Sequence, residues 1–181
     1  NDRIVQAEVE TNIETIVGGT FRTIVYKNTA EASEHIALVK GDVSTELPTL
    51  VRMHGFNIFD YIYSANKTFE LHRAMEIIAD EGRGVIVLIR SPSVTALSDY
   101  VREHIGAVNQ SKSLMKESSA LFKDYGVGAQ ILRDLGVREM ILLSNTKRSI
   151  VGLEGHDLKI VEQRPIGHSS VRPVVAGASH A

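Results

Sequence analysis

Residues 71–89 read LHRAMEIIADEGRGVIVLI, and the hydrophobic period changes within this stretch. In its first half, apolar side chains recur at i, i+3, i+4 and i+7, the spacing of one face of a helix. Thr68 or Asn66 is expected to cap the start of this helix, and Gly82 stands where a left-handed helix end is favoured. The unbroken apolar run 85–89 is typical of a strand covered on both faces. A helix that leads into a buried strand is half of an α/β unit, so the stretch predicts the α/β class.

The same arrangement recurs at residues 124–143, which read DYGVGAQILRDLGVREMILL. Four apolar residues from Val127 to Leu135 fall on one face of a helix that is expected to end at Gly136. Residues 140–143 then form a second buried strand. The glycines at the start of this helix lack the full Gly-x-Gly-x-x-Gly pattern of a phosphate-cradling loop. We therefore expect them to allow close packing of the helix on its neighbour.

Outward from these two units, the N-terminal third of the chain is rich in strands. The β-prone runs 20–26, 35–39 and 50–54 are bounded by turn residues. Residues 55–66 are aromatic and polar without a clear period, and we expect a loop there. The sequence shows no internal repeat. It predicts a single mixed α/β domain, with a β-rich N-terminal third followed by alternating helices and strands.

The remaining elements have weaker patterns. We expect a helix over 95–108, another helix over 147–153 and a last strand over 158–161. The chain beyond that strand becomes rich in Gly, Ser, Pro and Ala and has little to bury. These features predict one domain over 1–166 and a loose C-terminal tail over 167–181.

Composition limits the possible functions. The 181 residues include no cysteine, which excludes disulfides, thiolate nucleophiles and sulfur-ligated zinc. The net charge of −2 gives no general attraction to nucleic acid or to anionic lipid. No apolar run approaches the roughly 18 residues of a membrane span. We expect a cytoplasmic protein that binds neither nucleic acid nor a membrane. The missing initiator methionine favours an excised part of a longer protein.

Three segments carry a family resemblance: VKGDV at 39–43, EGRGVIV at 81–87 and DYGVGAQILRDLGVR at 124–138. In that order and with compatible spacing, they resemble GTP cyclohydrolase II, the zinc enzyme that opens GTP at the start of riboflavin biosynthesis. The match runs from about Glu8 to Pro165, and its third segment is the most specific. The resemblance implies the fold of that family for nearly the whole chain.

The family holds its zinc with three cysteines, and this chain offers none of them. In the family, the strand carrying Arg52 and His54 continues into a Ser-Glu-Cys segment, but here Asn57 stands at the first ligand position. The other two ligands correspond to the neighbourhood of 65–68, where Ala, Asn, Lys and Thr occur. Zinc takes thiolate, imidazole or carboxylate ligands. We therefore expect no metal and no other cofactor, although the family implies zinc.

Residues that the family uses on GTP are replaced as well. Its catalytic Asp and Arg correspond to Leu121 and Lys123, so we expect no catalytic residue. Its Gln-Glu-Gly-Arg segment is replaced by Ser-Pro-Ser-Val after Arg90. The nucleotide-binding stretch is changed least, because a hydroxyl and a cation remain there. The candidates for a residual nucleotide or phosphate site are Arg52, His54, Arg90, Ser144 and Arg148.

Other sites have simpler explanations. A metal site built from His54, His72 and Asp60 stays open, but a strand-end histidine and a solvent-facing helix histidine are the simpler interpretation. Ser91 and Ser93 lack the Gly-x-Ser-x-Gly spacing of a nucleophile elbow, so we expect helix caps there. Without a metal to fix the 55–66 loop, its large apolar side chains are expected to fill the old cavity and to be buried. These side chains are Phe56, Ile58, Phe59, Tyr61 and Tyr63.

The resemblance also implies a partner. In many bacteria a GTP cyclohydrolase II domain follows a 3,4-dihydroxy-2-butanone-4-phosphate synthase domain in one polypeptide. We expect this chain to be the non-catalytic half of such a protein, a homodimer that stabilises the attached synthase. Two alternatives stay open. One is a regulatory domain that binds GTP, another nucleotide or a flavin, and the other is a working cyclohydrolase with unusual ligands that releases formate and pyrophosphate from GTP.

Overall fold

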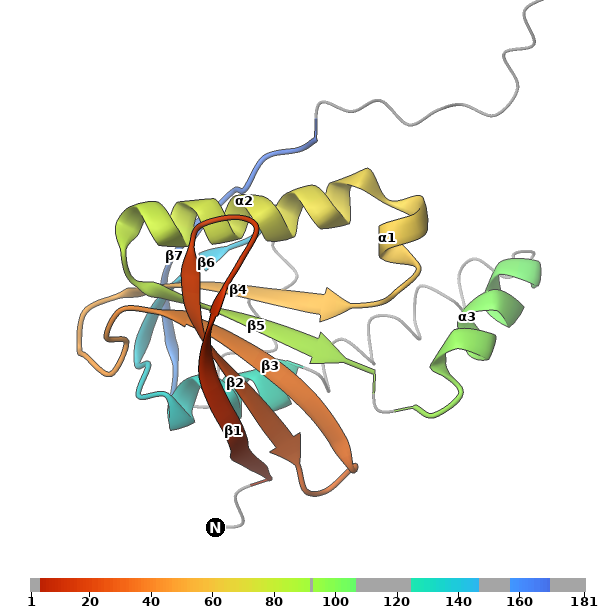
Figure 1. The fold of residues 1–181 in the computed structure, drawn as a ribbon, viewed down its shortest axis with the longest axis horizontal. Helices are drawn as coiled ribbons and strands as arrows, with labels where there is room; N and C mark the ends of the chain where they lie inside the picture. The colour runs from red at the N-terminus through yellow and green to blue at the C-terminus, as the bar shows by residue number, and fades with distance from the viewer. Residues whose placement is uncertain (1–3, 92, 107–124, 147–156, 170–181) are drawn as a thin grey trace, which may run out of the picture.

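A computed structural model describes residues 4–91, 93–106, 125–146 and 157–169. These residues form one sheet with helices on both of its faces (Figure 1). No helix in this described part is long and apolar enough to cross a bilayer. The α/β class and the strand-rich N-terminal third, both expected from the hydrophobic pattern, are confirmed.

The sheet has seven strands in the order β1-β2-β3-β5-β4-β6-β7. The neighbours from β1 to β5 pair antiparallel, and those from β5 to β7 pair parallel. The mixed sheet thus joins an antiparallel meander to a small parallel α/β unit. The strands are β1 (Val5–Glu14), β2 (Thr20–Asn28), β3 (Ser33–Lys40), β4 (Thr49–Phe56), β5 (Gly84–Arg90), β6 (Glu139–Leu143) and β7 (Lys159–Arg164).

The helix α2 (Ala65–Glu81) covers one face of the sheet (Figure 1). Its apolar stripe is buried as the spacing predicts, and it packs with side chains such as Leu50 and Ile86 from the strands. The helix ends at Gly82 in the left-handed conformation, as expected. Its start differs from expectation, because Ser64 is the cap and its side chain accepts a hydrogen bond from the backbone N–H of Lys67 at 3.3 Å.

A second helix, at residues 125–134, covers the opposite face of the sheet. Ile131 and Leu132 are fully buried there against side chains of β4 and β5 that include Val51 and Val87. Successive side chains of β5 therefore point to opposite faces of the sheet and contribute to the core on both sides. This explains why its sequence is an unbroken apolar run rather than an alternating one.

The strand β1 was not predicted. It is ten residues long, and after its first residue every side chain is exposed. Because neither face is covered, the sequence carries no apolar alternation that would reveal the strand. Its pairing with β2 holds it in place, with a register shift between Ala7 and Val9.

Two short helices follow the C-terminal ends of strands. The expected loop after β4 contains α1 (Asp60–Tyr63), and α3 (Ala96–Ile105) follows β5, inside the range predicted for a helix. The helix expected over 147–153 lies outside the described residues. So do residues 170–181 of the expected tail, whereas the backbone N–H of Gly167 donates to Asn145 at 3.2 Å.

The three segments that carry the family resemblance meet in space. Gly41 has a φ of +65°, and a Cβ atom there would lie 2.4 Å from the carbonyl oxygen of Gly82. Gly136 has a φ of +87°, and its Cβ would lie 2.5 Å from the hydroxyl oxygen of Ser44. Arg83 donates to Thr49 Oγ1 at 2.9 Å. We call this group the motif corner.

The motif corner lies where the parallel strands begin. In the sheet, Lys40 at the end of β3 is opposite Gly84 at the start of β5, and Leu50 at the start of β4 is opposite the same glycine. Glycine is needed at the first and third motifs because an L side chain is disfavoured at positive φ and has no room. The residues that reveal the family therefore serve close packing at this end of the sheet.

Candidate functional site

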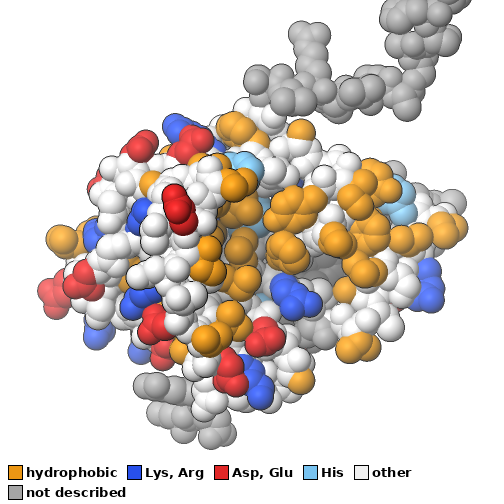
Figure 2. Space-filling model, viewed as in Figure 1, with side chains coloured by type: hydrophobic (Ala, Val, Ile, Leu, Met, Phe, Trp, Pro, Cys, Tyr) orange, Lys and Arg blue, Asp and Glu red, His pale blue; other side chains and the backbone are white. Residues whose placement is uncertain are grey.

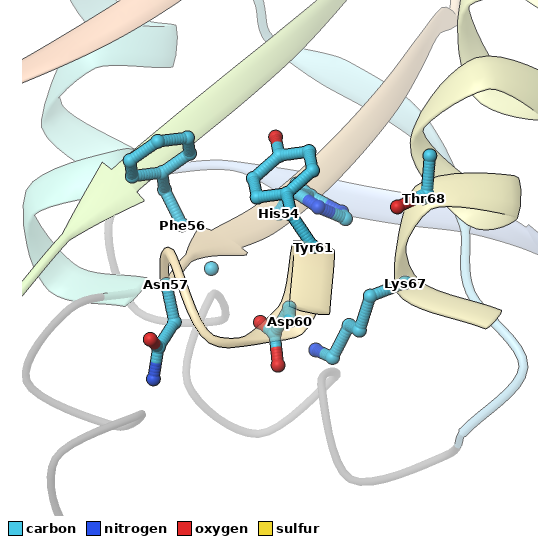
Figure 3. Close-up of a pocket in the computed structure, with 8 residues that line it drawn as sticks. His54, Phe56, Asn57, Asp60, Tyr61, Lys67 and Thr68 are labelled. Atoms are coloured by element: carbon cyan, nitrogen blue, oxygen red, sulfur yellow. The ribbon is translucent and has the colours of Figure 1, made fainter. Parts of the chain in front are cut away.

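A narrow pocket lies at the opposite end of the sheet, where β4 ends. It is formed by the residues from His54 to Asn57, by the segment of α1 and by the first turn of α2 (Figure 3). In open α/β sheets, ligands bind at the carboxyl ends of the strands, and this pocket is in that position. Its space has no room for a water molecule. The lining residues are His54, Gly55, Phe56, Asn57, Asp60, Tyr61, Lys67 and Thr68.

Beneath the pocket, the buried Arg52 of β4 forms an ion pair with Glu70 of α2, whose side chain is partly exposed. Its Nη2 donates to a carboxylate oxygen of Glu70 at 2.8 Å, and its Nη1 donates to the carbonyl oxygen of Leu143 at 3.1 Å. Arg52 is only 8% exposed, and its Nε has no partner among the described residues. Burial lowers the pKa of this guanidinium, and the Glu70 carboxylate opposes that shift. The pair ties β4, β6 and α2 together.

His54 comes two residues later on the same face of β4 and is 4% exposed. Its Nδ1 has no hydrogen-bond partner in the described part of the chain. Burial, together with the nearby cations Arg52 and Lys67, lowers the pKa of His54 to about 3. The imidazole is therefore neutral at pH 7, and it can accept or donate a hydrogen bond but does not supply a positive charge.

This burial predicts acid sensitivity. An unfolded chain protonates His54 near pH 6.5, whereas the folded chain does so only near pH 3. Between these values the unfolded state binds more protons, so the free energy of unfolding rises with pH, by at most about 1.4 kcal/mol per pH unit for this group. We expect His54→Gln to flatten this slope in urea unfolding at pH 4.5, 5.5 and 7.5. An unchanged slope would contradict the burial of a neutral imidazole.

The pocket offers few metal ligands. His54 supplies an imidazole and Asp60 a carboxylate, while Lys67 brings a cation. The Asn57 side-chain oxygen already accepts a hydrogen bond from the backbone N–H of Phe59 at 2.9 Å. No group of three His, Asp or Glu side chains suited to a metal occurs among the described residues. The donor set here does not fit the three-ligand zinc of a hydrolytic site.

The residues expected for a nucleotide site are only partly brought together. Arg52 and His54 share the pocket end of β4, and Ser144 follows β6, next to the Leu143 carbonyl that Arg52 binds. The Ser144 hydroxyl donates to the carbonyl oxygen of Thr146 at 3.0 Å. Arg90 ends β5 with an exposed side chain. Leu121, Lys123 and Arg148 lie outside the described residues.

Sequence reasoning missed the buried His35 of β3. The Nδ1 of His35 accepts a hydrogen bond from the backbone N–H of Arg90 at 3.1 Å, and its Nε2 lies 3.2 Å from the Ser33 hydroxyl. Burial first, and then the nearby Arg90, lower the pKa of His35. The alternation of β3 could have revealed it, because residues 33, 35, 37 and 39 are all buried.

The prediction that apolar side chains of the 55–66 loop fill the old cavity is wrong. Phe56, Ile58, Tyr61 and Tyr63 are 40–74% exposed, and Phe59 is half-buried. The polar groups buried near the end of β4 are Arg52, which pairs with Glu70, and His54. Phe56 and Tyr61 line the pocket but stay 40–50% exposed, and Phe59 stacks on Tyr100 of α3 instead of filling the pocket.

Comparison with known proteins agrees with the motifs. A family model described as GTP cyclohydrolase II matches residues 6–165. The riboflavin biosynthesis protein RibBA of Bacillus cereus (strain B4264) is 36% identical over 174 residues, which cover 92% of this chain and 44% of the relative. The RibBA protein of Bacillus cytotoxicus is 37% identical with the same coverage. The chain thus spans less than half the length of these relatives.

A solved structure is also similar. It is the crystal structure of RibBX from A. baumannii, described as a two-domain 3,4-dihydroxy-2-butanone 4-phosphate synthase. The TM-score is 0.56 at 28% sequence identity, covering 91% of this chain and 40% of that one. The matched family model, the RibBA relatives and the three motifs agree. The chain belongs to the GTP cyclohydrolase II family.

Proposed function

We propose that this domain does not open GTP and serves as a non-catalytic module in riboflavin biosynthesis. One observation carries the proposal. At the end of β4, where the family resemblance places a zinc ion, the chain has Asn57, Lys67 and Thr68 around a space with no room for water. Hydrolysis of this kind needs a metal that generates hydroxide and polarises its target. Because the sequence has no cysteine, no thiolate is available to bind such a metal.

The experiment that tests this is an assay for formate release. The purified chain is incubated with GTP, zinc and magnesium, and formate and bound zinc are measured. We expect neither formate above background nor stoichiometric zinc. A Lys123→Ala variant is the control for contaminating activity. Zinc-dependent formate release that disappears in this variant would favour the alternative of a working cyclohydrolase with unusual ligands.

We infer that the positive role is to dimerise and to stabilise an attached 3,4-dihydroxy-2-butanone-4-phosphate synthase in the cytoplasm. Support comes from the close packing of the family motifs at the motif corner, and from the two-domain description of the similar RibBX structure. A domain that only packs against its partners needs the fold of its family but not the catalytic residues.

Deleting this domain from the full-length protein is expected to lower the melting temperature and the activity of the synthase. The reason is that a domain that binds only the folded partner stabilises it by mass action. Synthase rate and thermal unfolding are measured for the full-length protein and for the truncated one. If both quantities stay the same after deletion, the stabilising role is wrong.

A second candidate, a regulatory domain that binds a nucleotide or a flavin, is favoured by one feature. The Nδ1 of His54 has no partner among the described residues and lies beside Lys67, so a polar ligand that opens the pocket finds a hydrogen-bonding group and a cation. Calorimetric titration of GTP with zinc and magnesium present tests it. Micromolar binding, weakened by Lys67→Ala, would make regulation the leading function, and no heat at two temperatures would exclude it for GTP.

A further inference from the structure

A large apolar area lies exposed beside the pocket, on α1 and α3 (Figure 2). Hydrophobic side chains gather there on the right-hand side of the view, whereas the opposite side is mostly polar and charged. We call this area the α1/α3 surface. Its members, all 44–79% exposed, are Ile58, Tyr61, Ile62, Tyr63, Leu97, Val101 and Ile105.

The helix α3 has an unusual relation to the rest of the domain. It is ten residues long, and none of its residues is buried. Its contact with the described domain includes the stacking of Tyr100 on Phe59, with ring centroids 4.5 Å apart. A helix of this length is marginal in water and normally depends on packing of an apolar stripe. Here Leu97, Val101 and Ile105 form such a stripe along the whole helix and leave it facing solvent.

The α1/α3 surface is large enough to supply much of one partner's share of a stable interface. An aromatic side chain buries about 150–250 Å². Only two of the seven side chains are aromatic, and an aliphatic side chain buries about 60–120 Å². Their exposed parts together offer on the order of 500 Å² of apolar surface, more than half of the roughly 800 Å² that one partner contributes to a standard interface. Apolar patches of this size on a protein surface often mark an interaction site.

The charges around this surface indicate what covers it. Acids and bases are mixed at its rim, and Asp99 pairs with Arg102 at 3.2 Å on the same helix. A partner of strong single charge would gain little here. In a second copy of the chain, by contrast, apolar side chains would face apolar side chains, and the mixed charges of the two rims could pair. Such self-complementarity is the condition for a two-fold interface.

We propose that a second copy of this chain covers the α1/α3 surface, with the two α3 helices packed antiparallel and Val101 near the two-fold axis. In this arrangement Leu97 of one copy packs on Ile105 of the other, and the exposed rings of α1 close the sides. The inference rests on the proposed dimerising role and assigns the surface that performs it.

The first test is a charge placed at the centre of this surface. Val101→Glu brings two carboxylates together across the axis in an apolar setting. We expect it to weaken the dimer by about 30-fold or more, the loss typical of a central interface residue. Dissociation constants are measured by sedimentation equilibrium on the full chain. Leu47→Glu is the matched control, because Leu47 is a comparably exposed apolar residue (62%) outside this surface.

The second test uses the absence of cysteine from the sequence. A single introduced thiol can only cross-link to its own counterpart, so Val101→Cys reports directly on the two-fold axis. Packed helices about 8–10 Å apart bring facing Cα atoms to the roughly 4.4–6.8 Å that a disulfide spans. We expect rapid oxidation of Val101→Cys to a covalent dimer and none for Leu47→Cys at equal concentration.

The outcomes separate this inference from the proposed function. A wild-type dimer that is unaffected by Val101→Glu, or weakened equally by Leu47→Glu, overturns the assigned surface and leaves the dimerising role intact. A wild-type chain that stays monomeric at millimolar concentration overturns both. In that case, if Val101→Cys in the isolated chain is protected from a thiol reagent, another segment of the same chain covers the surface. If protection appears only when the synthase part is present, the synthase covers it. The formate assay is independent of all these results.

Discussion

Glu70→Ala is expected to lower the free energy of unfolding by about 3–5 kcal/mol, because it leaves the Arg52 guanidinium buried without its counter-ion. Arg52 is 8% exposed, and with Glu70 removed the Leu143 carbonyl is its one remaining hydrogen-bond partner among the described residues. Burial lowers the pKa of this group, because removing the guanidinium from water disfavours its charged form. Urea unfolding at pH 7 measures the loss.

The chain contains a matched control for this prediction. Glu76 pairs with Arg73 at 3.1 Å on the same helix, but both side chains are nearly half exposed. Exposed pairs contribute about 0–1 kcal/mol, so Glu76→Ala should change little. The double variant Arg52→Met with Glu70→Leu removes both charges and is expected to recover most of the lost stability. Equal losses for Glu70→Ala and Glu76→Ala would contradict a buried, energetically coupled pair.

Gly41→Ala is the second change with a large expected effect, about 3 kcal/mol or more of unfolding free energy. A left-handed backbone at φ +65° costs an L residue about 1–2 kcal/mol. The added Cβ would also lie 2.4 Å from the Gly82 carbonyl oxygen, and a backbone atom cannot move aside as a flexible side chain would. Thermal and urea unfolding both report the loss.

Gly82→Ala separates the two causes. Its φ of +80° imposes the same kind of conformational cost, but a Cβ there meets no described atom within 4 Å. We expect it to lose only the conformational part, about 1–2 kcal/mol. If the two variants unfold at the same urea concentration, the close approach of the first two family motifs is not a source of stability.

The helices and strands that pack in the core were predictable, because their buried positions carry apolar residues at the spacing of a helix or a strand. The stripe of α2 and the unbroken apolar run of β5 are examples. The strand β1 was not predictable in this way, since a strand exposed on both faces is specified by its pairing with β2 rather than by its own pattern. The cap of α2 was misplaced by two residues or more because Ser64, Asn66 and Thr68 are all acceptable caps by type.

The site was predictable only in part. The resemblance placed Arg52, His54 and Asn57 at the end of one strand, and the structure has them there. It could not identify Glu70 as the partner of Arg52, because the pair joins a strand to a helix 18 residues away and either residue alone fits a solvent-facing role. The exposed rings of α1 were predicted wrongly for a related reason. Whether a loop folds inward or outward depends on what already fills the space beneath it.

The motif corner and the pocket lie at opposite ends of the same strands, and this separation has an evolutionary consequence. Substitutions where β4 ends do not reach Gly41, Gly82 or Gly136, so they leave the close packing at the other end undisturbed. Such an architecture lets selection on chemistry and selection on folding act on different residues. A lineage can relax the first while the second stays strict, and the chain then keeps the signature of its ancestry at the end of the sheet opposite His54 and Asn57.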